Sequence, residues 1–180
     1  MKNWITIKES NATDLKIFES VWYLRKHPEQ EKEGNFIVLK SPRWVNIIPI
    51  TKNKEVVLIK QYRHGIDAVT LEVPGGLVQD DDTTQAGAER ECLEETGFGS
   101  SDPSVWLGEN LPNPAFLNNT CNSYVWSDCE LIQKQKFDTH EDIEVLLVPL
   151  SEIKQYILDA KITHSLVLTA FFYFQLKYGL

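Results

Sequence analysis

The sequence has few of the residues and segments that mark secreted and membrane proteins. Its three cysteines, Cys92, Cys121 and Cys129, form no CxxC pair, so neither a disulfide framework nor a cysteine zinc site is expected. The first ten residues lack the apolar core of a signal peptide. The longest apolar run, from Leu166 to Leu176, falls well short of the roughly 18 residues that span a bilayer. We therefore expect reduced thiols, a cytoplasmic location and no membrane partner.

Positive charge is also scarce. The chain has 18 Lys and Arg residues against 26 Asp and Glu residues, and its formal net charge is −8. Such an acidic surface repels phosphate backbones, so a nucleic-acid partner is not expected. An anionic substrate would need positive charge supplied locally, and a metal held by clustered carboxylates would supply it. The 180 residues, 42% of them hydrophobic, suit one globular domain with a sizeable core.

Short β-branched and aromatic runs alternate with turns along the chain. Strands are expected at residues 5–7, 18–24, 36–39, 44–51, 56–62, 70–73, 124–126 and 143–148. Helices are expected from a cap at Asp82, with Gln85 as its capping-box partner, to Gly97, from Ser151 to about Lys161, and from Ser165 to Lys177. This order lacks a regular βαβ alternation, which favours a mixed α+β sandwich over a doubly wound fold.

The helix expected after Asp82 carries glutamates on one face. Glu91 and Glu95 lie one turn apart, and Glu94 lies beside them. A solvated acidic face is the ordinary interpretation of such a helix. However, Arg90 is its only cation, so no i,i+4 lysines balance the carboxylates. Oxygen donors without His or Cys suit a hard cation such as Mg²⁺ or Mn²⁺.

The stretch from Gly76 to Phe98 closely resembles the Nudix box, G-x5-E-x7-R-E-U-x-E-E-x-G-U, in which U is a bulky aliphatic residue. The positions that match at the right spacing are Gly76, Arg90, Glu91, Glu94, Glu95 and Gly97. Three positions depart from the pattern: Asp82 replaces the first Glu, Cys92 replaces an aliphatic residue, and Phe98 is aromatic. The shorter Asp82 bears most on the site, because the resemblance implies that this carboxylate ties the loop to the arginine.

Residues outside the box resemble the branch of the family that acts on ADP-ribose and nucleoside diphosphate sugars. The pattern elements are Gln61-Tyr62-Arg63, Glu72-Val73-Pro74-Gly75-Gly76, and Pro114, which lies 16 residues after Phe98. The resemblance implies a Nudix α/β/α sandwich with a mixed sheet, in a hydrolase domain at residues 41–180. Residues 1–40 would be a β-strand region that builds a homodimer, since the aromatic-bearing segment from Trp22 to Leu24 is too sparse for a core of its own.

The resemblance also implies roles for the box residues. Glu91 and Glu95, with Glu94 next, are the expected metal ligands for Mg²⁺, with Mn²⁺ as the alternative, and the carbonyl of Gly75 joins them. Arg90 is expected to orient the loop and the helix through carboxylates rather than to contact substrate. Glu94 and Arg90 are counted with the catalytic residues.

Other candidates lie outside the box. The guanidinium of Arg63 is suited to bidentate contact with phosphate, with a solvated strand-end arginine as the alternative. Glu72 is expected to bind metal or a sugar hydroxyl, with a cross-strand lysine partner as the alternative. Pro114 is placed at the substrate. Glu141, in a late acidic loop, is the candidate general base, and Asp142 competes with it.

The resemblance implies an enzyme that hydrolyses the pyrophosphate bond of ADP-ribose or a nucleoside diphosphate sugar, which gives a nucleoside monophosphate and a sugar phosphate. One alternative is a Nudix hydrolase of another substrate, such as a dinucleoside polyphosphate or coenzyme A. Another is a regulator that binds ADP-ribose without cutting it. Members that have lost catalysis usually lack box glutamates, and this chain keeps Glu91, Glu94 and Glu95.

Overall fold

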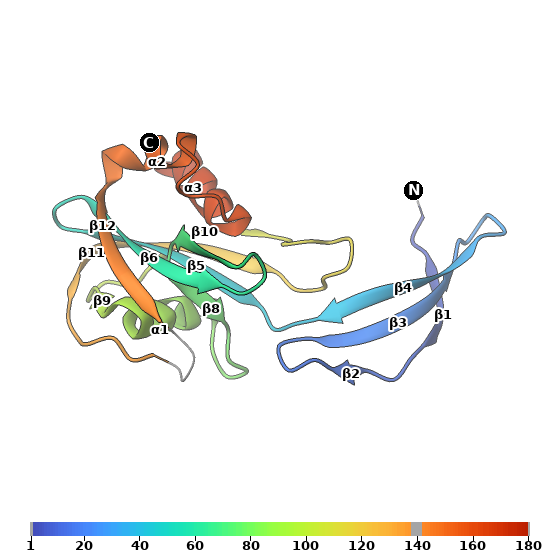
Figure 1. The fold of residues 1–180 in the computed structure, drawn as a ribbon. Helices are drawn as coiled ribbons and strands as arrows, with labels where there is room; N and C mark the ends of the chain where they lie inside the picture. The colour runs from blue at the N-terminus through green and yellow to red at the C-terminus, as the bar shows by residue number, and fades with distance from the viewer. Residues whose placement is uncertain (1, 138–141, 180) are drawn as a thin grey trace. The chain divides into compact units, whose positions relative to one another are not determined.

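The computed structural model describes residues 2–137 and 142–179, and Figure 1 shows their arrangement. The strands are β1 (Ile5–Glu9), β2 (Thr13–Asp14), β3 (Glu19–Lys26), β4 (Glu33–Lys40), β5 (Trp44–Thr51), β6 (Glu55–Arg63), β7 (Ala68–Glu72), β8 (Gly75–Leu77), β9 (Phe98–Gly99), β10 (Val105–Asn110), β11 (Cys121–Leu131) and β12 (Ile143–Pro149). The helices are α1 (Thr84–Thr96), the 3₁₀ turn η1 (Leu150–Glu152), α2 (Ile153–Leu158) and α3 (Ser165–Tyr178). Contacts divide the chain into two units, the smaller of which combines the residues before Arg43 with Leu111–Thr120.

The larger unit is built on one mixed sheet. The strands run in the order β10-β11-β5-β6-β12, with β7 on β6, β8 on β5 and β9 on β11. β11 and β5 are parallel, whereas the other pairs are antiparallel. The central strand β5 is rich in β-branched residues and is buried along most of its length, as is expected of a strand covered on both faces. The predicted mixed α+β sandwich is confirmed.

Helices cover both faces of this sheet, with α1 on one side and α2 and α3 on the other (Figure 1). Side chains alternate along β5 between two apolar clusters. Ile48 packs in the cluster that holds Phe171 of α3, while Val45 and Ile47 pack in the cluster that holds Ala88 of α1. Burial of these apolar side chains away from water is the main contribution to the stability of the three packed layers. Within the described residues, no helix is both long enough and apolar enough to cross a membrane.

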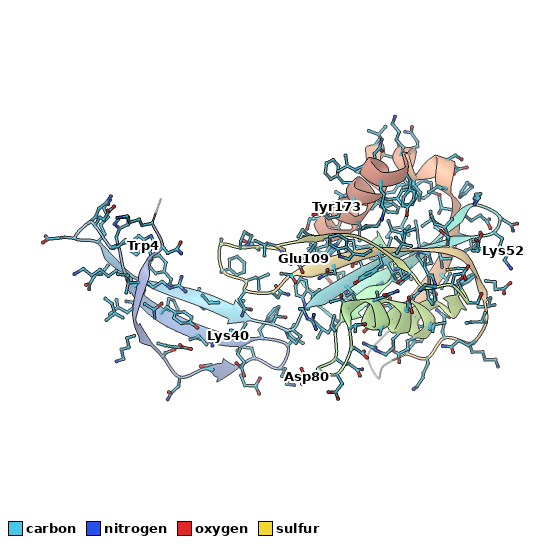
Figure 2. All side chains as sticks on the ribbon, turned by 180° about the vertical axis from the view of Figure 1, so that it is seen from behind. Trp4, Lys40, Lys52, Asp80, Glu109 and Tyr173 are labelled. Carbon is cyan, nitrogen blue, oxygen red and sulfur yellow. The ribbon has the colours of Figure 1, made fainter. Side chains whose placement is uncertain are left out.

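α3 lies close over the edge strand β10. The ring of Tyr173 covers Gly108, where an added Cβ would come within 2.8 Å of ring carbons, so only glycine allows this approach. The Tyr173 hydroxyl donates to the carbonyl of Glu109 at 2.8 Å, and both residues are labelled in Figure 2. Lys177 Nζ donates to the carbonyl of Trp106 at 3.0 Å.

The three cysteines are free thiols, and all are buried. Burial raises the pKa of Cys121 to about 12. Burial also raises the pKa of Cys129 to about 12, against a smaller opposing effect of a backbone hydrogen bond. Both groups are therefore neutral thiols at physiological pH and poor nucleophiles.

The predicted cap of α1 is wrong by one residue. Thr83 is the N-cap, with extended backbone angles, and its hydroxyl accepts from the amide of Ala86 at 3.1 Å. Asp82 points instead to Arg90, with Asp82 Oδ2 3.3 Å from Arg90 Nε. Gln85 does not complete a capping box, because its amide donates to the carbonyl of Ser104 at 2.9 Å. Gly97 ends the helix in the left-handed conformation, as predicted (φ 76°).

Two other expectations about local structure need correction. The helix predicted from Ser151 begins as the 3₁₀ turn η1, continues as α2 and ends at Leu158, before Ala160 takes a positive φ of 55°. No strand was expected directly after residues 70–73, yet Gly75 and Gly76 begin the strand β8. An added Cβ at Gly75 would lie 2.2 Å from the carbonyl oxygen of Val45, so β8 can pair with β5 only because this residue is glycine.

The smaller unit is a single-layer sheet with little core. Its strands run in the order β1-β3-β2, and β4 also pairs with β3, antiparallel and along its whole length. Residues 111–120 belong to this unit. The amide of Leu39 donates to the carbonyl of Phe116 at 2.8 Å, and the amide of Asn118 donates to the carbonyl of Leu39 at 3.3 Å. Among the described residues of this unit, Val21 is the one fully buried hydrophobic side chain. Exposed apolar side chains include Trp4, Ile5, Ile7, Leu15, Ile17, Trp22, Phe36 and Ile37.

Candidate active site

The candidate site is built where β8 meets α1, next to the connecting loop that carries Asp80, Asp81 and Asp82, here called the acidic loop. Gly75 and Gly76 bring the β8 backbone directly against the helix. An added Cβ at Gly76 would lie 2.6 Å from the carboxyl carbon of Glu91, so this carboxylate rests on the glycine backbone. The amide of Gly75 donates to Glu95 Oε2 at 3.0 Å. The two glycines thus give two α1 carboxylates close access to the β8 main chain.

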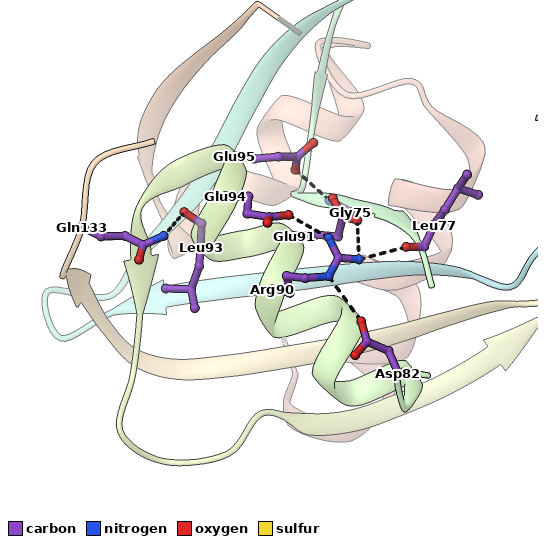
Figure 3. Close-up of polar contacts among 9 residues, drawn as sticks. All are labelled: Gly75, Leu77, Asp82, Arg90, Glu91, Leu93, Glu94, Glu95 and Gln133. Carbon is purple, nitrogen blue, oxygen red and sulfur yellow. Dashed lines mark hydrogen bonds and ion pairs between the residues drawn. The ribbon is translucent and has the colours of Figure 1, made fainter. Parts of the chain in front are cut away.

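Arg90 is the centre of an ion-pair cluster on α1 (Figure 3). Its guanidinium lies 2.7 Å from Glu94, 2.9 Å from Glu91 and 3.3 Å from Asp82. It also donates to the carbonyl of Leu77 at 3.1 Å. Burial tends to lower the pKa of Arg90, but the surrounding carboxylates outweigh this effect and raise it, so the guanidinium stays charged. Arg90 therefore joins the helix, the acidic loop and β8, and Asp82 reaches it despite being one methylene shorter than glutamate.

Glu95 is the most buried carboxylate of the cluster. Its side chain lies one helical turn from Glu91, and the residue is only 3% exposed. A carboxylate held at this depth needs compensating polar partners, and the Gly75 amide is one of them. Glu91 is more buried than Arg90, with 14% of its side chain exposed against 25% for Arg90.

The charge balance of the cluster favours a cation. Among the described residues, Asp82, Glu91, Glu94 and Glu95 bring four carboxylates to the same cluster as the guanidinium of Arg90. All side-chain donors are oxygens, which suits a hard divalent ion. Within residues 2–137 and 142–179, no three His, Cys, Asp or Glu side chains converge as a preformed metal cage. The donor chemistry fits a divalent metal, although three of the four carboxylates, those of Asp82, Glu91 and Glu94, form ion pairs with Arg90.

A second buried pair lies across the β6–β7 hairpin. Arg63 Nε and Nη2 donate to the two oxygens of Glu72 at 2.8 and 2.7 Å, and Glu72 is 3% exposed. The hydroxyl of Thr70 donates to the same carboxylate. Burial acts to raise the pKa of Glu72, but the bonds from Arg63 and Thr70 outweigh it and lower the pKa. The cross-strand partner of Glu72 is thus Arg63 and not a lysine, while the nearby Lys60 pairs with Glu144 at 2.8 Å.

This pair predicts a loss of stability in acid. Because the pKa of Glu72 is lowered below 4.5 in the folded state, its stabilising effect is present above pH 4.5 and is lost as the pH falls through the folded-state pKa. We expect the free energy of unfolding to fall more steeply in the wild type than in Glu72→Gln between about pH 6 and pH 3. Urea denaturation at several pH values measures both slopes. Equal slopes would show that the Glu72 carboxylate does not titrate differently on folding.

The remaining candidates are Glu141, Asp142 and Pro114. Glu141 lies outside the described residues. Asp142 is described, and it is exposed immediately before β12. Pro114 belongs to the smaller unit, where it lies in a turn closed by hydrogen bonds from the amides of Phe116 and Leu117 to the carbonyl of Asn113.

Several contacts at the site involve residues that the sequence did not single out. Thr70 completes the Glu72 network, and its place two residues before Glu72 on the same strand face was a usable signal. The carbonyl of Leu77 is a backbone acceptor and has no side-chain signal. Gln133 and Gln135 bond the end of α1 from a segment some 40 positions away, so no local pattern marks them.

Comparisons with known proteins identify the family and the fold. Residues 40–167 match the family described as the NUDIX domain. A methanol dehydrogenase activator from Bacillus methanolicus is 28% identical over 146 residues, which cover 79% of this chain and 77% of that protein. An ADP-ribose pyrophosphatase from Bacillus subtilis (strain 168) is 22% identical over 144 residues, with the same coverage of both chains. A crystal structure of an ADP compounds hydrolase shares the fold, with a TM-score of 0.87 at 18% identity over 100% of this chain and 98% of that one.

Proposed function

The chain belongs to the Nudix family of pyrophosphohydrolases, and on that premise we propose that it hydrolyses the pyrophosphate bond of ADP-ribose or a related nucleoside diphosphate sugar with Mg²⁺. With ADP-ribose, one water is consumed, one P–O bond of the diphosphate breaks, and AMP and ribose 5-phosphate leave. The observation that carries the proposal is the set of α1 carboxylates gathered on Arg90 and on the β8 glycines. The name of the Bacillus subtilis relative, an ADP-ribose pyrophosphatase, supports ADP-ribose as the substrate.

Nudix hydrolases generally depend on a divalent metal. In this chain we assign its binding to Glu91, Glu95 and Glu94 with the carbonyl of Gly75, for Mg²⁺ and with Mn²⁺ as the alternative. When bound, such an ion neutralises the pyrophosphate and stabilises the charge that develops on the leaving oxygen. The grouping of carboxylate oxygens from Asp82, Glu91, Glu94 and Glu95 among the described residues supports this assignment.

The protein groups have separate tasks in this proposal. Arg90 holds Glu91 and Glu94 in place and fixes the acidic loop through Asp82, which makes it an organiser of the site. Glu141 accepts the proton of the attacking water, and Asp142 is the alternative base. Such catalysis consists mostly of positioning and electrostatic stabilisation.

Arg63, Glu72 and Pro114 stay in the proposal as substrate-binding residues. The side chain of Arg63 is 39% exposed, and its Nε and Nη2 hold Glu72. This bidentate pair supports a shared role, in which Glu72 orients the guanidinium toward a phosphate. A direct contact of Glu72 with metal or sugar would require the pair to open.

A panel of substrates tests the proposal and separates it from its alternatives. ADP-ribose, GDP-mannose, UDP-glucose, NADH and Ap4A are each incubated with the protein and Mg²⁺, and the products are quantified by chromatography. We expect turnover to be fastest with ADP-ribose or another nucleotide sugar. Fastest turnover of Ap4A would support the dinucleotide alternative. Binding of ADP-ribose without turnover of any compound would support a regulator. The Bacillus methanolicus relative is named as an activator, which is a regulatory role.

We also propose that the chain forms a homodimer through the smaller unit. Trp22 and Ile37 are 51% and 38% exposed and pair across β3 and β4, so one sheet face presents adjacent apolar side chains to solvent. Apolar patches of this kind mark interaction surfaces, and two-fold dimers are the commonest oligomers. Light scattering at micromolar concentration is expected to give the mass of a dimer, and Ile37→Arg is expected to give a monomer. A monomeric wild type would reject the proposal.

A further inference from the structure

The segment that follows β11 lies along the carboxyl end of α1. The amides of Ile132 and Gln133 donate to the carbonyl of Gly97 at 3.0 and 3.3 Å, and the amide of Lys136 donates to the carbonyl of Glu94 at 2.8 Å. A helix leaves its last four carbonyls without partners inside the helix. Residues 132–136 therefore supply main-chain donors to the helix end that carries Glu94 and Glu95.

Two glutamine side chains in this segment add to these bonds. Gln133 Nε2 donates to the carbonyl of Leu93 at 3.0 Å (Figure 3), and that carbonyl also accepts from the amide of Gly97 at 3.0 Å. Gln135 Nε2 donates to the carbonyl of Glu95 at 2.6 Å. The two side chains have the same chemistry and act on the same helix end, two residues apart.

Gln135 differs from Gln133 because it also reaches β12. Its Nε2 lies 3.4 Å from the carbonyl of Ile143, the first residue of that strand, and a primary amide has two hydrogens to share between two acceptors. Glu95 is in turn bonded through its carboxylate to the amide of Gly75. A continuous chain of bonds thus runs from β8 through Glu95 and Gln135 to the start of β12.

We propose that Gln135 is a positioning residue that couples the carboxylate end of α1 to the start of β12. The effect of this coupling on the reaction rests on the proposed function. In the sequence, Glu141 and Asp142 directly precede Ile143, so the strand start that Gln135 holds is also the anchor of the candidate bases. Small errors in the placement of a catalytic group cost rate far more than they cost stability.

The kinetic test compares Gln135→Leu with Gln133→Leu as a matched control. Both variants lose an amide donor to α1, and both sites are exposed, so both proteins are expected to fold. With ADP-ribose and saturating Mg²⁺, Gln135→Leu is expected to lower kcat about tenfold, the rate effect of two ordinary hydrogen bonds, with KM unchanged. Gln133→Leu is expected to keep kcat within about twofold. Unchanged kcat in Gln135→Leu, or an equal fall in both variants, would overturn the proposal.

Hydrogen exchange tests the coupling without any turnover. In Gln135→Leu, amide exchange is expected to accelerate about two- to tenfold in peptides that cover both the end of α1 and the start of β12. In Gln133→Leu, the acceleration is expected at the end of α1 alone. Unchanged exchange at the start of β12 in Gln135→Leu would overturn the proposal. If the wild type turned over no substrate in the panel, the proposed function would fail, and this exchange experiment would still decide the coupling.

Discussion

Glu95→Gln is expected to lower kcat on ADP-ribose by a factor of about 10² to 10³, the usual effect of losing one electrostatic contact to the transition state. The amide keeps the shape and one oxygen, which can still accept from the amide of Gly75. It loses the negative charge that we assign to holding the divalent cation. The melting temperature should hold or rise slightly, because Glu91 and Glu95 repel each other at i,i+4. Kinetics at saturating Mg²⁺ and a thermal melt measure the two effects.

The matched control is Glu89→Gln on the same helix. Glu89 lies outside the carboxylate cluster and accepts from the amide of Ser104 at 2.8 Å, so its change alters α1 by the same chemical step at another place. Its kcat is expected to stay near that of the wild type. A folded Glu95→Gln protein with wild-type kcat would show that Glu95 is a buried structural carboxylate and no metal ligand.

Arg63→Leu is expected to lower the free energy of unfolding by about 3 kcal/mol, because it leaves the carboxylate of Glu72 buried without its ion-pair partner. This value is at the low end for a buried pair, since the Arg63 side chain is 39% exposed and partly solvated. Glu72 itself is only 3% exposed, so water cannot easily replace the two bonds. Urea denaturation of the wild type and the variant measures the difference.

Two further variants separate this effect from a general effect of removing a cation from β6. Lys60→Leu breaks the Lys60–Glu144 pair, both members of which are exposed, and should cost under about 1 kcal/mol. The double change of Arg63 and Glu72 to leucine removes both charges and should recover most of the lost stability. If Arg63→Leu were no more damaging than Lys60→Leu, the buried pair would contribute little to stability.

The sequence predicted the elements whose pattern is strong over several residues. β5 was expected at residues 44–51 and is found there, because a segment rich in β-branched residues suits a strand buried on both faces. α3 was expected at residues 165–177 and spans Ser165–Tyr178. β10 was not expected, since it contains Gly108 and the exposed Trp106, which break an alternating pattern.

Errors arose where a distant residue decided between local options. Asp82 and Thr83 are both good cap residues, and Arg90 decided between them by drawing Asp82 away from the helix end. The box spacing placed the α1 carboxylates correctly on one helix face. The partner of Glu72 does not follow from direct strand pairing, because the β6–β7 register sets Glu72 opposite Ile59 and Arg63 opposite Ala68, and the side-chain contact between Arg63 and Glu72 spans the length of that ladder. A sequence pattern alone does not specify that register.

The most direct test of the account is the identity of the products that the purified protein forms from ADP-ribose. The protein is incubated with ADP-ribose and Mg²⁺, with and without excess chelator, and the products are identified by chromatography and mass spectrometry. The account predicts equal amounts of AMP and ribose 5-phosphate with Mg²⁺ and none with the chelator. Intact ADP-ribose in the presence of Mg²⁺, or undiminished cleavage in the presence of the chelator, would contradict it.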